Sequence, residues 1–241
     1  MFTRSDESYM MDFENLDINR FLNDKGNPLV NIISKLTDSC SILDVGAGNG
    51  LLAWLIKKMK QQIVVDGIEP SMTGTKLARQ FYRHFYTNYL QNIADEVFKN
   101  EYDFIILADV IEHVNDPLEF VKLISQNILE KTKIILSIPN VAHGSVRLGL
   151  LNGEFNYQDS GLLEKTHLRF FTFSTILELF KNADLFIESI DFLQVPFKIE
   201  SHFKIKPSIF SMVNLLTNIH CRTFQYLFVV SKNQCEMYEG K

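Results

Sequence analysis

The sequence predicts an α/β fold in which helices cover both faces of a doubly wound, mostly parallel sheet. Short apolar runs alternate with segments of helical periodicity over residues 41–138. The runs are continuously apolar, as expected for strands that are buried on both faces of a sheet. With 46% hydrophobic and 22% charged residues, the 241-residue chain has the composition of a globular protein.

The expected elements follow in order along the chain. Five strands are predicted first, at 41–45, 63–68, 85–90, 104–108 and 133–138. Helices are predicted between them at 50–60, 71–82 and 117–129, and the last has Pro117 at its first position. A further helix at 172–182 precedes two strands, at 185–195 and 223–230, which we expect to form an antiparallel pair at one edge.

Two long connections interrupt this alternation. Residues 139–172 are rich in turn-forming residues, and a connection of this length is usually functional, so we interpret it as a substrate-side lid. Residues 196–222 form an insert between the last two strands. The insert caps the ligand site, forms a contact in a homodimer, or simply packs on the core. We divide the chain into an N-terminal extension, 1–30, and one domain, 31–241.

Composition and charge exclude several classes of protein. The net charge is −5 and no long basic run occurs, which disfavours nucleic-acid binding. Three scattered cysteines are too few for a disulfide framework or a zinc cluster. No apolar run has the length of a membrane span, and the acidic N-terminus does not resemble a signal peptide. We therefore expect a cytoplasmic protein without a membrane span.

The stretch ILDVGAGNG predicts a ligand-binding turn after the first strand. Gly46, Gly48 and Gly50 give the spacing G-x-G-x-G, in which the backbone can approach a ligand closely. Asp44 stands before the glycines, and Glu69 ends the second strand, where an acid would bind ribose hydroxyls. A carboxylate at this turn would repel a pyrophosphate and suits a ligand with positive charge. This argues against a nicotinamide-dependent oxidoreductase, which remains one alternative.

These motifs resemble those of class I S-adenosylmethionine-dependent methyltransferases. ILDVGAGNG and GIEPS are similar to the first two motifs of that family, and EYDFIILADVIEHVNDPLEF is similar to a later one. EHVNDP resembles the branch with ubiquinone-pathway O-methyltransferases. SIPNVAHGSVR and GLLEKTHLRFFT resemble bacterial methyltransferases associated with surface-glycan synthesis. The resemblance covers about residues 31–191 and implies a Rossmann-like, seven-stranded sheet. It also implies S-adenosyl-L-methionine as cofactor, with S-adenosyl-L-homocysteine as product.

The resemblance implies the following cofactor contacts. Asp44 would hold the ammonium of the cofactor, and Glu69 would bind the ribose hydroxyls. The backbone of Ala108 would close over the methionine chain. The other implied contacts are Gly46, Ala47 and Gly48 at the methionine part, Pro70 and Ser71 beside the adenine, and Asn92 with Ile93 near the adenine amino group, where Asp95 is a rival.

The substrate side contains several candidate residues. His113 follows the fourth strand and would act as a base or orient the substrate; alternatively, it only orders the loop before Pro117. His167 is a second candidate base. Glu112 either supports the loop or, by resemblance to quinone-type enzymes, helps to hold a divalent ion. A single Glu-His pair is weak evidence for a metal, so we expect none.

His143, Arg147 and Arg169 lie in the expected lid and are predicted to contact the substrate. Alternatively, Arg169 pairs with Asp159 or Glu164 and fixes the lid. The sequence thus predicts methylation of a small-molecule acceptor, at an oxygen of a sugar, a nucleotide sugar or a quinone-like compound. A binding protein without catalysis, acting as a regulator or scaffold, is the alternative from another class.

Overall fold

The computed structural model describes residues 17–24, 26–59, 62–72, 75–195 and 218–233. These residues contain one seven-stranded sheet with the strand order β3-β2-β1-β4-β5-β7-β6. The strands are β1 (Ser41–Val45), β2 (Val64–Ile68), β3 (Phe85–Tyr86), β4 (Phe104–Ala108), β5 (Lys133–Pro139), β6 (Phe186–Gln194) and β7 (Thr223–Ser231). The first five strands are parallel, and β7 pairs antiparallel with β5 and β6. The predicted fold class is confirmed.

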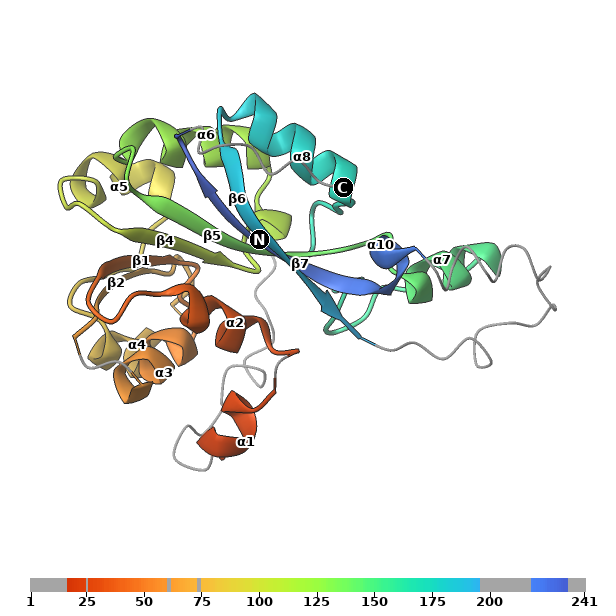
Figure 1. Ribbon diagram of the computed structural model, residues 1–241, viewed down its shortest axis with the longest axis horizontal. Coiled ribbons are helices and arrows are strands. Elements are labelled where there is room, and N and C mark those ends of the chain that lie inside the picture. The colour runs from red at the N-terminus through yellow and green to blue at the C-terminus, as the bar shows by residue number, and fades with distance from the viewer. Residues whose placement is uncertain (1–16, 25, 60–61, 73–74, 196–217, 234–241) are drawn as a thin grey trace.

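Helices cover both faces of the sheet, and each face has its own apolar core (Figure 1). One face carries α5 (Leu90–Val97), α6 (Pro117–Asn127) and α8 (Phe173–Asn182). The other carries α2 (Pro28–Lys35), α3 (Leu51–Met59) and α4 (Thr75–Ala78). The strands between them are buried on both sides, which explains why their sequences are continuously apolar.

The remaining elements lie at the periphery or next to the carboxyl ends of the strands. The short helix α1 (Ile18–Leu22) precedes α2, and α7 (Gly144–Leu151) and α10 (Ile219–Arg222) lie together near the N-terminal start of β7 (Figure 1). Two 3₁₀ helices are present, η3 (Arg79–Phe81) after α4 and η4 (Ile111–His113) after β4. Because η4 follows a central strand, it lies at the edge where open α/β sheets bind ligands.

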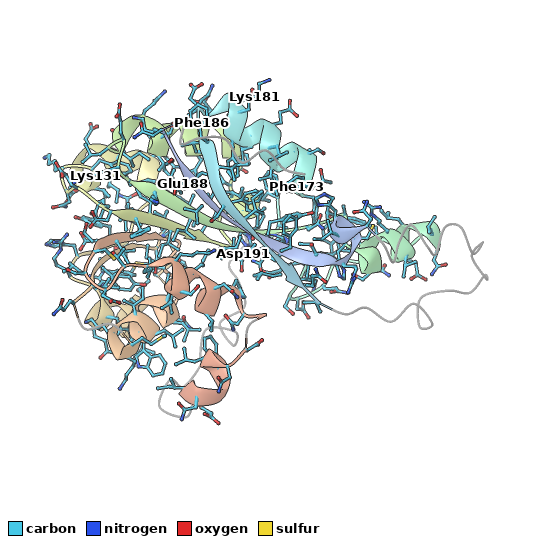
Figure 2. The ribbon with its side chains drawn as sticks, viewed as in Figure 1. Lys131, Phe173, Lys181, Phe186, Glu188 and Asp191 are labelled. Carbon is cyan, nitrogen blue, oxygen red and sulfur yellow. The ribbon has the colours of Figure 1, made fainter. Side chains whose placement is uncertain are left out.

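The edge strand β6 carries charged residues that face the neighbouring elements. Figure 2 shows Glu188 and Asp191 along this strand. Glu188 pairs with Lys133 of β5 at 2.6 Å, and Asp191 pairs with Lys35 of α2 at 2.6 Å. Charged side chains on an edge strand also discourage pairing with another sheet.

Several element boundaries differ from those predicted. The third strand is only two residues long, and residues up to Leu90 belong to a loop and to the start of α5 instead. The predicted lid segment, residues 139–172, contains the helix α7, which was not predicted and whose N-terminus is capped by the side chain of His143. Most of the predicted insert lies outside the described residues, as do residues 1–16. None of the described helices is long and apolar enough to cross a membrane.

Candidate cofactor and active site

The glycine-rich turn joins β1 to α3 at the carboxyl end of the sheet. Gly46, Gly48 and Gly50 have φ values of 80°, 53° and 86°, which are costly for residues with a side chain. A Cβ at Gly46 would lie 2.7 Å from Cγ2 of Val110, and one at Gly50 would lie 2.9 Å from Cα of Ala78. The turn therefore needs glycine for both its conformation and its packing.

Glu69 lies beside this turn at the end of β2. Its carboxylate accepts hydrogen bonds from the backbone N–H of Gly48 and of Ser71, both at 2.8 Å. A carboxylate offers about four acceptor positions, so capacity remains for hydroxyl donors of a ligand. Because Gly48 already donates to a carboxylate, this N–H is not available to a phosphate. The predicted juxtaposition of Glu69 with the glycines is present, with Pro70 next to it.

Asp44 is buried beneath the turn, with 2% of its surface exposed. The hydroxyl of Tyr82 donates a hydrogen bond of 2.7 Å to its carboxylate. Burial raises the pKa of Asp44 to about 7, helped by the nearby Glu69 carboxylate and opposed by the hydrogen bond from Tyr82. The sequence did not indicate Tyr82, because nothing in the motif connects it to a residue 38 positions earlier.

The segment after β4 packs directly on the glycine turn. Ala108 ends the strand, and Asp109 follows with a φ of 54°. The Asp109 carboxylate accepts hydrogen bonds from Ser137 of β5 at 3.0 Å and from Gln225 of β7. Val110 then covers Gly46, as the close approach of its Cγ2 shows. This contact brings η4, with Glu112 and His113, next to the place where the cofactor turn lies.

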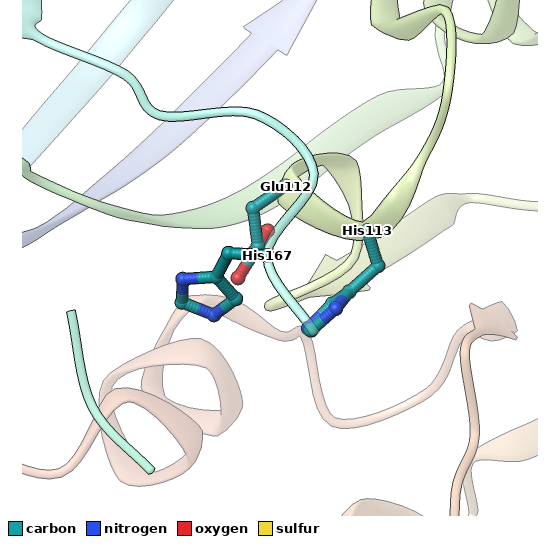
Figure 3. A group of neighbouring side chains, drawn as sticks. All are labelled: Glu112, His113 and His167. Carbon is teal, nitrogen blue, oxygen red and sulfur yellow. The ribbon is translucent and has the colours of Figure 1, made fainter. Parts of the chain in front are cut away.

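The lid places His167 beside His113. The two imidazole rings have centroids 4.9 Å apart and meet edge to face. Figure 3 shows them with Glu112, which lies next to His113 on η4. His167 and Glu112 are buried, whereas His113 is half-buried. The two candidate bases, 54 residues apart in the chain, are thus brought together where the segment 139–172 contacts η4.

The two residues that were predicted near the adenine amino group both lie on α5. Asn92 is exposed on α5 and donates to Asn88 at 3.0 Å, and Ile93 packs against the core. Asn88 lies in the short loop between β3, which ends at Tyr86, and α5. The sequence analysis did not consider Asn88, because the strand was expected to continue to residue 90.

The three predicted substrate contacts have structural partners. His143 accepts from Ser145 N–H, and its Nε2 lies 3.2 Å from the carbonyl oxygen of Val195; burial lowers its pKa. Arg147 lies close enough to His220 to lower the pKa of that side chain, after the larger effect of burial. Arg169 donates to the carbonyl of Asn115 at 2.6 Å. Asp159, an expected partner of Arg169, pairs with Lys165 instead.

The sheet order and the glycine turn flanked by Asp44 and Glu69 are typical of α/β proteins that bind a nucleoside-containing cofactor at the carboxyl ends of their strands. A family model described as a methyltransferase domain matches residues 16–190. The chain therefore belongs to this family of S-adenosylmethionine-dependent methyltransferases, and S-adenosylmethionine is its cofactor.

Relatives agree with this assignment. A ubiquinone biosynthesis O-methyltransferase of Rickettsia bellii (strain OSU 85-389) is 30% identical over 152 residues, which is 62% of this chain and 62% of that protein. The chain thus spans less than two thirds of that relative. A protein of the same description from Rickettsia felis is 28% identical over 201 residues, covering 80% of this chain and 79% of the relative.

Solved structures support the fold. A SAM-dependent methyltransferase from Archaeoglobus fulgidus superposes with a TM-score of 0.60 at 16% identity, over 85% of this chain and 91% of that one. The plantazolicin methyltransferase BpumL in complex with SAH gives 0.57 at 17% identity, over 95% and 94%.

Proposed function

We propose that this protein transfers the methyl group of S-adenosylmethionine to an oxygen of a small-molecule acceptor: a sugar, a nucleotide sugar or a quinone-like compound. In this reaction the acceptor oxygen attacks the methyl carbon in line with the sulfur. The carbon–sulfur bond breaks, its electron pair returns to sulfur, and S-adenosylhomocysteine leaves. The acceptor hydroxyl loses its proton. Because the donor is already activated, positioning supplies much of the catalysis.

The packing of Val110 on Gly46 carries this proposal. It joins the turn that binds the methionine part of the cofactor to η4, which bears His113. His167 joins His113 from the lid, so two imidazoles stand at the side from which an acceptor would approach. We assign these histidines to the acceptor oxygen, as a base or as groups that orient it. The ubiquinone-pathway relatives support an oxygen acceptor.

The positions of Asp44 and Glu69 beside the glycine turn indicate how the cofactor binds. We propose that Asp44 faces the cofactor ammonium, that Glu69 binds the ribose hydroxyls, and that Gly46, Ala47 and Gly48 line the methionine part. Ala108 closes this side, and Asn88 is a better candidate than Asn92 for the adenine edge, because it lies in the loop at the carboxyl end of β3 and not on α5. The three residues His143, Arg147 and Arg169 would contact the acceptor only after releasing or rearranging their present partners.

Glycine variants test the cofactor site with a matched control. Gly46→Ala adds a Cβ in the left-handed region and against Val110, whereas Gly153→Ala has a similar φ of 76° with nothing within 4 Å. S-adenosylmethionine and S-adenosylhomocysteine should raise the melting temperature of wild type and of Gly153→Ala, because ligands stabilise the state that binds them. Gly46→Ala should lose this shift. A shift with NAD but not with either adenosyl ligand would contradict the proposal.

An acceptor panel tests catalysis. Release of S-adenosylhomocysteine should require one of the acceptor classes above, and His113→Ala and His167→Ala should each lower kcat/KM by about 100-fold or more. The alternative, a regulatory or scaffold protein that binds the cofactor without turnover, predicts binding with no release across the panel.

A further inference from the structure

Tyr82 is a buried tyrosine that reaches the acid of the glycine turn from a distant part of the chain. It directly follows η3, and only 7% of its surface is exposed. Its hydroxyl donates a hydrogen bond of 2.7 Å to Oδ2 of Asp44, and no other described residue donates a hydrogen bond to this carboxylate. The second oxygen, Oδ1, is therefore the one left to accept a hydrogen bond from a ligand.

Gly67 gives the ring of Tyr82 the space to make this contact. Gly67 is the residue of β2 that pairs with Asp44 of β1. A Cβ at Gly67 would lie 2.7 Å from both Cδ1 and Cε1 of Tyr82. The tyrosine ring thus occupies the space that a side chain at position 67 would fill, directly beside Asp44. The ring of Phe85 also packs on it, with the centroids 5.1 Å apart, so the ring is held in one position.

The segment that carries Tyr82 also packs on the glycine turn at a second point. A Cβ at Gly50 would lie 2.9 Å from Cα of Ala78, at the end of α4, and 3.2 Å from Cδ2 of Phe81 in η3. The backbone of the turn and the carboxylate beneath it therefore both contact the segment from α4 to Tyr82. These two contacts fix the hydroxyl of Tyr82 relative to the turn.

The hydroxyl of Tyr82 favours the ionised form of Asp44. Burial raises the pKa of Asp44, the hydrogen bond from Tyr82 lowers it, and the Glu69 carboxylate raises it. The residues paired with Asp44 on the neighbouring strands, Gly67 and Ile106, are not titratable. Tyr82 itself keeps its proton, because burial and the Asp44 carboxylate hold the pKa of its phenol well above the ordinary value. Without this donor, the carboxyl would be protonated over more of the neutral pH range.

We propose that Tyr82 is a positioning residue for the cofactor: it holds the Asp44 carboxylate in its ionised form, with Oδ1 left for the ammonium of S-adenosylmethionine. This inference rests on the proposed function, in which Asp44 faces that ammonium. A protonated carboxyl attracts an ammonium much less strongly than a carboxylate does. The affinity for the cofactor should therefore depend on pH, and the hydroxyl of Tyr82 should set the pH at which binding becomes strong.

The pH dependence of cofactor binding tests this role without a catalytic assay. Calorimetry gives the Kd of S-adenosylhomocysteine for the full-length wild type and for Tyr82→Phe at a series of pH values. Dividing the two Kd values at each pH removes the effect of titration of the ligand itself. Tyr82→Phe should bind about tenfold more weakly below pH 7, because a hydrogen bond to a charged group is lost. The ratio should approach one at about pH 9, where Asp44 is ionised in both proteins.

Tyr102→Phe is the matched control. Tyr102 is also buried, and its hydroxyl also donates to a buried carboxylate, that of Asp66 in β2, at 2.9 Å. This variant should be less stable than wild type but should bind S-adenosylhomocysteine with the wild-type pH dependence. Replacement of Tyr82 by 3-fluorotyrosine keeps the test informative if Tyr82→Phe fails to fold. Its phenol is more acidic and donates a stronger hydrogen bond, so strong binding should begin at a lower pH than in wild type.

Three results would each overturn the role of Tyr82. They are an unchanged Kd in Tyr82→Phe, a loss of affinity by the same factor at every pH, and an equal pH shift in Tyr102→Phe. Methyl transfer to an acceptor could still proceed in each case, so the proposed function would be unaffected. Conversely, the expected pH shifts without release of S-adenosylhomocysteine across the acceptor panel would contradict the proposed function and leave the role of Tyr82 intact.

Discussion

Asp44 places a carboxylate in the interior, where a charge is costly without a partner. Tyr82 donates one hydrogen bond to it, yet burial still raises its pKa to about 7. The ionised form of this buried carboxyl destabilises the ligand-free protein, and a cationic ligand would compensate its charge. The proposal that Asp44 faces the cofactor ammonium comes from the motif. The titration of Asp44 near neutral pH depends on tertiary burial, which the sequence of the turn does not contain.

Asp44→Asn should therefore stabilise the ligand-free protein while weakening cofactor binding. The folded-state pKa lies above the ordinary value of 3.8, so the folded chain keeps a proton that the unfolded chain releases between these values. Wild-type stability consequently falls as pH rises from about 4 to 7. Denaturant unfolding should show a gain for the variant of up to about 4 kcal/mol at pH 8 and much less at pH 5.

The same variant should bind S-adenosylmethionine about tenfold or more weakly, because a charged hydrogen bond is lost. At pH 6.5 the ammonium should displace a proton from wild-type Asp44. Calorimetry in buffers of different ionisation enthalpy should detect this release in wild type and not in the variant. Equal proton release in both proteins would show that another group titrates.

At the scale of elements, the predicted lid segment, residues 139–172, is hydrogen-bonded to η4 and to the loop after it. The lid loop donates two backbone hydrogen bonds to Glu112, and Arg169 adds a third contact by donating to the carbonyl of Asn115. The length and the turn-forming residues of the segment 139–172 predicted a functional connection. They did not predict that this segment is hydrogen-bonded to Glu112 and Asn115. Helix α7 was not predicted because its N-cap is His143, an unusual capping residue, and its first residue is Gly144. The buried strands were predicted well, since their apolar runs follow directly from coverage on both faces.

Arg169→Ala should loosen the lid. Loss of the hydrogen bond to Asn115 should lower the free energy of local opening by about 1 kcal/mol. This corresponds to roughly fivefold faster hydrogen exchange at the backbone amides of positions 168 and 169. Lys165→Ala is the control, because Lys165 forms an ion pair with the exposed Asp159 and surface ion pairs contribute little. If exchange is unchanged while KM for an anionic acceptor rises, Arg169 contacts the acceptor and does not hold the lid.

At the scale of the molecule, the sheet fixes the position of the glycine turn relative to η4. β1 and β2 supply Asp44 and Glu69, whereas β4 leads into η4. Asp66, fully buried in β2, connects these parts: it accepts two hydrogen bonds from Arg83, at 2.6 and 2.9 Å, and one from Tyr102, at 2.9 Å. The alternation of elements predicted the sheet, but this connection joins residues distant in the chain, so no local pattern indicates it.

Asp66→Asn should lower the stability of the whole fold at neutral pH. Burial alone would raise the pKa of Asp66, but the hydrogen bonds from Arg83 and Tyr102 outweigh it and hold the pKa below 3.8. The stabilisation is therefore present above the unfolded pKa and is lost as pH falls through the folded value. Urea unfolding should show a loss of about 1 to 3 kcal/mol at pH 7, since Arg83 and Tyr102 lose a charged acceptor.

The difference between wild type and Asp66→Asn should shrink as the pH falls below about 4, because the wild-type carboxylate then becomes protonated. Asp159→Asn, which removes an exposed ion pair, should have the same free energy of unfolding as wild type at pH 7 and at pH 3. A loss that is the same at pH 7 and at pH 3 would mean that Asp66 acts through packing and neutral hydrogen bonds. In that case the charge of Asp66 would not contribute to the position of β1 and β2 relative to β4.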